Sequence, residues 1–139
     1  MGEERKYTLC KEERLHGRDA VEQLFKNAGS RSMVAFPLRV VYVLTPPMAD
    51  TSVNVRMLVS VPKKHFKRAV KRNRVKRQVR EAYRKHKYPL IEAVGKAGDQ
   101  HLSLAFVWLD DKLHDTDAVE KKVERLLVRI GEKLSQGKQ

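Results

Sequence analysis

The chain has few of the residues that define several other protein classes. Its 139 residues include one cysteine, Cys10, which excludes an internal disulfide and fits a reducing compartment. One cysteine and five scattered histidines do not provide the ligand set of a structural zinc site. No apolar run reaches the length of about 18 residues that a membrane span needs, and residues 1–15 lack the apolar core of a signal peptide. We therefore expect a cytoplasmic protein.

Clustered carboxylates, which a metal-dependent nuclease needs, are also scarce. Asp110 and Asp111 are the one adjacent acidic pair beyond the glutamates near the N-terminus. They follow a predicted strand, where consecutive side chains point to opposite faces and do not share a site. The sequence therefore predicts no catalytic residue and no metal ligand in this chain.

Positive charge is what the chain has in excess, and most of it lies in one segment. Thirteen lysines and arginines and a single acid, Glu81, fall between Lys63 and Lys87, while the formal net charge of the whole chain is +13. Charge of one sign at this density repels itself and requires an external anion. A phosphate backbone is the commonest such partner, because its neutralisation releases counterions. This segment predicts nucleic-acid binding rather than a merely solvated surface.

The pattern of apolar residues predicts one domain over residues 15–135, between flexible segments at 1–14 and 136–139. The expected elements are a helix at 18–28, strands at 36–44, 53–61 and 101–109, a helix at about 70–87, a turn or short helix at 88–100, and a helix at about 118–134. Asp117 and Glu120 resemble a capping box at the start of the last helix. In this α-β-β-α-β-α order, the helices should cover one face of a small sheet and leave the other face open.

The basic helix is predicted to have two different sides. At about 100° per residue, its apolar side chains gather on one side and its polar ones on the other. The apolar side consists of Val75, Val79, Ala82 and Tyr83, and the opposite side of Asn73, Arg77, Arg80 and Arg84, with Lys76 and Lys87 beside them. Arginines suit phosphate because their planar guanidinium group can bind two oxygens at once.

The residues just before this helix should form a separate loop. The apolar phase of Phe66, Ala69 and Val70 does not continue into the helix, so residues 62–69 are predicted to be a loop or a first turn with its own orientation. Its cations would lie at the helix N-terminus, where backbone N–H groups also favour anions. These cations are Lys63, Lys64, Lys67 and Arg68.

Residues 59–84 resemble the signature of the bacterial ribonuclease P protein subunit. In that family a strand ends in a Lys-Lys pair, followed by an Ala-centred turn and then by Arg-Asn-Arg-x-Lys-Arg-x-x-Arg-Glu-x-aromatic-Arg. The matching positions are Lys63, Lys64, Ala69, Arg72, Asn73, Arg74, Lys76, Arg77, Arg80, Glu81, Tyr83 and Arg84. Two departures concern the turn, where many members have glycine and this chain has Phe66-Lys67-Arg68, and Val21, where many members have an aromatic residue.

The resemblance implies both a fold and an activity. The fold would be α+β, a small αβ sandwich with a left-handed β-α-β crossover around the basic helix, similar to the second domain of a small-subunit ribosomal protein. The activity would be that of a ribonucleoprotein endoribonuclease, which removes the 5′ leader from precursor tRNA. In such a complex the RNA is the catalyst and uses Mg²⁺, and this chain, a monomer when free, would bind the catalytic RNA and the leader.

The resemblance also implies which residues meet RNA. These are Lys63, Lys64, Lys67, Arg68, Arg72, Asn73, Arg74, Lys76, Arg77, Arg80 and Arg84. The leader would run over the open sheet face beside Phe25, Phe36 and Tyr42, whose rings could stack on unpaired bases. Core packing is the alternative for Phe25, and strand parity places Phe36 and Tyr42 on one face without identifying that face.

Two other functions fit part of the pattern. A ribosomal or other structural RNA-binding protein would carry the same charge without any role in cleavage. A DNA-binding module is disfavoured because the sequence predicts no helix-turn-helix pair and no leucine heptads after the basic helix.

Overall fold

A computed structural model of the chain describes residues 24–26, 29–45, 54–96 and 100–136. The elements are β1 (Arg31–Ala35), β2 (Leu38–Thr45), β3 (Val55–Ser60), α2 (Ala69–His86), α3 (Tyr88–Lys96), β4 (His101–Trp108) and α4 (Thr116–Gln136). Residues 24–26 are also helical. None of the helices in these ranges is long and apolar enough to cross a membrane.

The four strands form one sheet in the order β1-β2-β4-β3. β2 is antiparallel to both of its neighbours, and β3 is parallel to β4. Parallel neighbours cannot be joined by a tight turn, so the chain passes from β3 to β4 through α2 and α3. The expected α+β class and the β-α-β connection around the basic helix are confirmed.

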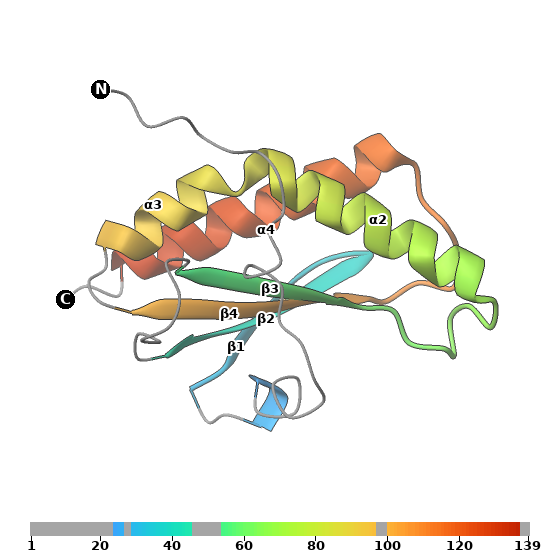
Figure 1. The fold of residues 1–139 in the computed structure, drawn as a ribbon, viewed down its shortest axis with the longest axis horizontal. Helices are drawn as coiled ribbons and strands as arrows, with labels where there is room; N and C mark the ends of the chain where they lie inside the picture. The colour runs from blue at the N-terminus through green and yellow to red at the C-terminus, as the bar shows by residue number, and fades with distance from the viewer. Residues whose placement is uncertain (1–23, 27–28, 46–53, 97–99, 137–139) are drawn as a thin grey trace.

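Helices α2, α3 and α4 all lie on one face of the sheet, as Figure 1 shows. Strand residues of one parity point toward these helices and form the main core with them. Trp108 and Phe106 of β4 and Tyr83 of α2 are among its largest fully buried side chains. The seam between sheet and helices therefore fixes which side of α2 is left for solvent.

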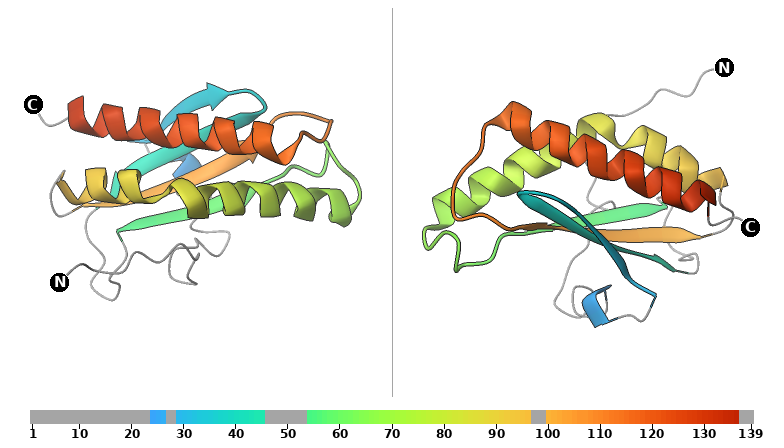
Figure 2. Two further views of the ribbon diagram at one scale, coloured as in Figure 1. Left: turned by 90° about the horizontal axis from the view of Figure 1, so that it is seen from above. Right: turned by 180° about the vertical axis from the view of Figure 1, so that it is seen from behind.

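Helices α2 and α4 lie side by side and run in the same direction (Figure 2). Gln78, in the middle of α2, bonds to Thr116 at the start of α4. His86, at the end of α2, bonds to Glu120 one turn further along α4. The N-terminal half of α2 thus extends beyond α4, past the end of the two-helix contact.

The predicted strand at 36–44 is one arm of a hairpin, which corrects the expected element order. Phe36 and Pro37 form the turn, with a cis peptide between them, and β1 pairs with β2 from Ala35↔Leu38 to Arg31↔Tyr42. β1 was not predicted because it is a short edge strand with mostly exposed side chains, so burial imposes no alternating pattern on its sequence.

Two helix predictions also change in detail. Residues Tyr88–Lys96 form α3, the short helix that was one of two expectations for residues 88–100, and Gly95 lies inside it. Helix α4 begins at Thr116, and the Val119 N–H donates to the Asp115 carbonyl oxygen at 3.0 Å. The capping box was wrong: the Glu120 carboxylate accepts hydrogen bonds from side chains of α2.

The sheet face opposite the helices is not fully open, contrary to expectation. Leu24 packs there against Val41, Val43 and Ala105, with Leu58 at the margin. The short helical piece that carries Leu24 is seen below the sheet in Figure 1. Of the predicted helix at 18–28, the structure describes only residues 24–26, and the rest lies outside the described residues. Most of the two segments predicted to be flexible lie outside them as well.

Candidate nucleic-acid interface

Helix α2 has the two sides that its sequence predicts. Val75, Val79 and Tyr83 have no exposed surface, and Ala82 retains 2%. On the other side, Asn73, Arg74 and Arg77 are exposed, and Lys76, Arg80 and Arg84 are partly exposed. Lys87, predicted to lie beside them, is instead buried at the end of α2, where the helix passes into α3. We call the outward set of Asn73, Lys76, Arg77 and Arg80 the α2 surface. Burial of the aliphatic side against the core is what holds these polar groups toward solvent.

The segment before α2 is a loop, as the break in apolar phase predicts. Phe66 is buried and anchors the loop in the core, whereas Val70, at the start of the helix, is 79% exposed. The His65 N–H donates to the Pro62 carbonyl oxygen at 3.1 Å, which closes a tight turn. We call residues 62–68 the basic loop, after its exposed cations Lys63, Lys64, Lys67 and Arg68.

Arg72 is directed toward this loop rather than outward. Its Nη1 donates to the carbonyl oxygens of Phe66 and Lys67, at 2.8 Å in both cases. A charged donor makes stronger hydrogen bonds than a neutral one, so Arg72 stabilises the shape of the basic loop. The sequence placed Arg72 among the RNA-binding residues and gave no indication of this internal contact.

The N-terminus of α2 lacks the groups that usually neutralise a helix start. Arg68 occupies the cap position without a side-chain hydrogen bond, and the first turn contains no acidic residue. The first N–H groups of a helix have no intrahelical acceptor and carry partial positive charge. This end of α2 and the basic loop therefore add two sources of positive potential at one place.

Arg84 forms an ion pair with Glu81 one turn before it. The hydrogen bond from Arg84 holds the pKa of Glu81 below its usual value, and the charges of Arg84 and Lys85 act in the same direction. The one acid of the basic segment therefore pairs with the C-terminal part of α2, whereas the cations toward its N-terminus are further from it.

Gln78 was not predicted as important, although it positions α2. It is 7% exposed, and its Nε2 donates to the His114 carbonyl oxygen and to Thr116 Oγ1, each at 3.1 Å. These bonds connect the middle of α2 to the segment that leads into α4. The sequence indicated that Gln78 would be buried, since position 78 lies next to the apolar side of the helix.

Histidine–carboxylate contacts form a second set that the sequence did not predict. His65 Nδ1 lies 2.5 Å from Asp111 Oδ1, and His114 Nε2 lies 2.7 Å from Asp110 Oδ2. The first contact joins the basic loop to the segment after β4. In the second contact, the hydrogen bond from His114 is the main cause that lowers the pKa of Asp110. Each carboxylate of the acidic pair therefore contacts a histidine, Asp111 the one in the basic loop and Asp110 the one four residues later in the chain.

The three aromatic residues predicted to line one cleft do not come together. Tyr42 is 5% exposed and points into the core beneath the helices, where burial raises its pKa. Phe36 lies in the hairpin turn, 55% exposed, and forms a T-shaped pair with the ring of His114 at a centroid distance of 6.4 Å. Phe25, 44% exposed, follows Leu24 on the opposite face of the sheet. Phe36 belongs to the turn before β2, so the strand parity used in the prediction does not relate it to Tyr42.

Metal-ligating side chains do not cluster in the part of the chain that the structure describes. No group of three or more His, Cys, Asp or Glu side chains there could hold a metal ion. What the α2 surface and the basic loop do present is exposed positive charge, which attracts polyanions.

Comparison with known proteins agrees with this reading. A profile of the family Ribonuclease P matches residues 9–131. The chain belongs to the ribonuclease P protein family. The ribonuclease P protein component of Porphyromonas gingivalis is 43% identical over 124 residues, covering 89% of this chain and 87% of the relative. That of Chlorobaculum tepidum is 38% identical over 112 residues, covering 78% and 71%.

The fold of the ribonuclease P protein family is seen again in a solved structure. The ribonuclease P protein of Thermotoga maritima aligns with a TM-score of 0.60 at 24% identity, covering 84% of this chain and 96% of that one. The fold resemblance extends over nearly all of that protein. The basic segment from Lys63 to Lys87 falls within the matched family region.

Proposed function

We propose that this ribonuclease P protein component assists a catalytic RNA in removing the 5′ leader from precursor tRNA. Family membership carries the proposal. The geometry gives it a physical basis, because the α2 surface and the basic loop present aligned cations beside an uncapped helix start. Such a surface binds a phosphate backbone without reading base sequence.

The cleavage itself is assigned to the RNA partner. The Mg²⁺ ions that it uses are proposed to be held by RNA, since the described residues of this chain contain no carboxylate cluster suited to them. The chain contributes by neutralising phosphates of the catalytic RNA, which reduces the repulsion between that RNA and its substrate. It is proposed to act in the cytoplasm and to be a monomer before it joins the RNA.

The leader is proposed to bind the sheet face opposite the helices. On this face Val34 of β1 and Arg39 of β2 are register partners, and both are exposed. Phe25 lies on the segment that packs against the same face. An exposed ring, an aliphatic side chain and a guanidinium group together can hold unpaired nucleotides of any sequence.

Reconstitution tests this function against the alternative of a structural RNA-binding protein. The protein is mixed with a bacterial ribonuclease P RNA and precursor tRNA at low magnesium, where the RNA alone is slow. We expect faster cleavage, tighter binding of substrates that carry a leader, and no cleavage by the protein alone. Unchanged cleavage and leader-independent affinity would favour the structural role. Cleavage without RNA would refute the assignment of catalysis to the partner.

A further inference from the structure

Helix α4 carries a second row of cations on the side that faces away from α2. Lys122, Arg125, Arg129 and Lys133 recur at intervals of three or four residues. At about 100° per residue they fall within about 80° of one another, and at 1.5 Å per residue they extend over about 16 Å. We call this row the α4 stripe. Lys122 is partly exposed, and the other three are exposed.

The charges of α4 are sorted by side. Glu120 faces α2, where it contacts Lys85 and His86, and it lies about 180° around the helix from Arg129. Within the described part of the chain, no member of the α4 stripe forms an ion pair. Of the acids in α4, only Glu132 borders the stripe. A solvated helix without a partner would have no reason to keep its acids and bases apart.

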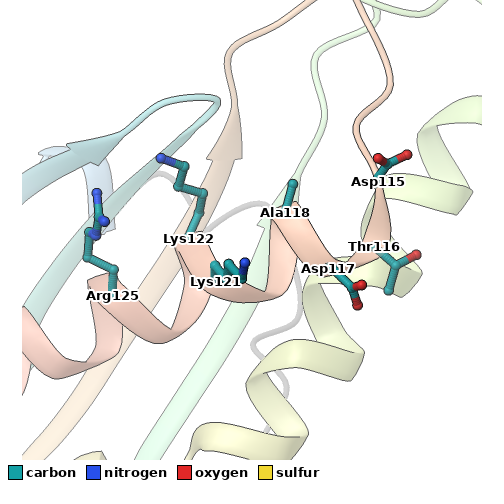
Figure 3. A pocket seen from close by; sticks show the side chains of 7 residues that line it. All are labelled: Asp115, Thr116, Asp117, Ala118, Lys121, Lys122 and Arg125. Carbon is teal, nitrogen blue, oxygen red and sulfur yellow. The ribbon is translucent and has the colours of Figure 1, made fainter.

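The two basic surfaces belong to opposite edges of the domain. α2 packs over β3, whereas α4 packs over β1 and β2, and β1 and β3 are the two edge strands. Figure 3 shows Lys122 and Arg125 projecting from α4 on the side of the β1–β2 hairpin. Arg31, exposed at the start of β1, adds a cation at this edge. One straight RNA segment on the α2 surface would therefore not cover the α4 stripe.

A shallow hollow lies at the N-terminal end of the α4 stripe (Figure 3). It is lined by Asp115, Thr116, Asp117, Ala118, Lys121, Lys122 and Arg125. The small Ala118 side chain leaves open space beside Lys121 and Lys122, where an anionic group could lie. The two aspartates close the opposite end and limit the anionic contact to the Lys122–Arg125 end.

The side chains of the α4 stripe select one kind of RNA. They include no aromatic ring, so they provide no platform on which unpaired bases could stack. Arginine and lysine along a straight helix match the continuous sugar–phosphate backbone of a base-paired segment, whose bases are not available for stacking. We propose that the α4 stripe binds the backbone of an RNA duplex, as a second contact separate from the α2 surface. The inference rests on the proposed function, because it takes RNA as the polyanion.

Three double variants of the full chain test the inference, each removing two positive charges. Arg125→Gln/Arg129→Gln changes the α4 stripe, and Lys76→Gln/Arg77→Gln changes the α2 surface. The matched control is Lys96→Gln/Lys112→Gln, at two exposed positions outside both surfaces. Glutamine is nearly as good a helix former as arginine or lysine, and circular dichroism melting confirms that each variant is folded. Affinity is measured by filter binding for a bacterial ribonuclease P RNA, a short RNA hairpin, and an unpaired RNA of equal length.

The α4 variant should bind the hairpin and the ribonuclease P RNA roughly ten-fold more weakly near physiological salt. The slope of log affinity against log salt should fall by about one for each arginine that contacts phosphate. The control should match the wild type. The inference would be overturned if the α4 variant bound these RNAs as tightly as the wild type does, or if the control lost as much affinity. It would also be overturned if the wild-type protein did not bind the hairpin. An equal loss for unpaired RNA would overturn the choice of duplex.

The same measurements separate this inference from the function on which it rests. If the α2 variant loses affinity for ribonuclease P RNA and the α4 variant does not, the second contact is refuted and the proposed function stands. If neither variant loses affinity, the contacts of both helices are refuted, and the reconstitution assay decides the proposed function separately.

Discussion

Arg72 Nη1 lies 2.8 Å from the carbonyl oxygen of Phe66, and this bond joins the first turn of α2 to the only buried residue of the basic loop. Lys67 supplies a second carbonyl to the same nitrogen. The loop cations on either side of Phe66 are exposed, so their positions depend on how firmly the loop backbone is held. We therefore expect Arg72 to affect RNA binding through the loop as well as through its own charge.

Replacing Arg72 with lysine should loosen the loop while keeping the charge. An ammonium group cannot reproduce the fixed geometry of the guanidinium fork, so we expect one or both carbonyl contacts to weaken. Amide hydrogen exchange at residues 63–68 should accelerate, with global stability lowered by about 1 kcal/mol. Arg74→Lys, at an exposed neighbouring position, is the control. Equal exchange in the two variants would mean that the contacts do not order the loop.

Arg77 should act directly on RNA through its charge. It is exposed in the middle of the α2 surface. Arg77→Ala should weaken binding to ribonuclease P RNA uniformly and lower the salt slope by about one phosphate contact. Filter binding over a range of salt concentrations measures both quantities, with Lys96→Ala as the control. An unchanged slope would show that Arg77 faces solvent in the complex.

The course of α2 could be predicted from sequence because burial imposes a period on it. Val75 and Val79 had to face the core, and this determined the opposite side that carries Arg77. The same reasoning located β3 and β4, whose alternating apolar residues are buried. Periodicity carries information wherever one side of an element is packed and the other is not.

Features set by contacts between distant segments could not be predicted in this way. Phe36 continues the apolar pattern of β2, yet the chain reverses at Phe36-Pro37 because β1 pairs back on β2. Glu120 occupies a capping-box position, but contacts with α2 determine where its carboxylate lies. The contact of Gln78 with His114 and two of the histidine–carboxylate pairs join residues at least 34 positions apart in the sequence. The third pair, Asp110 and His114, is local. No local period records such contacts.

Gln78 should stabilise the junction between α2 and α4. Gln78→Ala removes the donor to the His114 carbonyl oxygen and to Thr116 Oγ1, in a site that is closed to most water. We expect the free energy of unfolding to fall by about 1–2 kcal/mol, measured by urea denaturation. Gln100→Ala, at an exposed position, should leave it nearly unchanged. If the two variants are equally stable, the two hydrogen bonds contribute nothing to the junction.

Glu120 should make the stability of the domain depend on acid pH. The hydrogen bond from His86 holds the pKa of Glu120 below its usual value in the folded state, and the charge of Lys85 acts in the same direction. Between the lowered pKa and the ordinary value of about 4.3, the unfolded chain binds more protons than the folded one. The stabilisation by Glu120 is therefore fully present above the ordinary pKa and is lost as pH falls through the lowered one.

Replacing this carboxylate tests that dependence. Glu120→Gln should be less stable than the wild type at pH 7, and the difference should shrink as pH falls below about 4. Urea unfolding at several pH values measures it, with Glu132→Gln as the control, because Glu132 is an exposed acid of the same helix. A stability difference for Glu120→Gln that stays constant from pH 7 to pH 3, or one that Glu132→Gln reproduces, would contradict a specific contribution from the contact with His86.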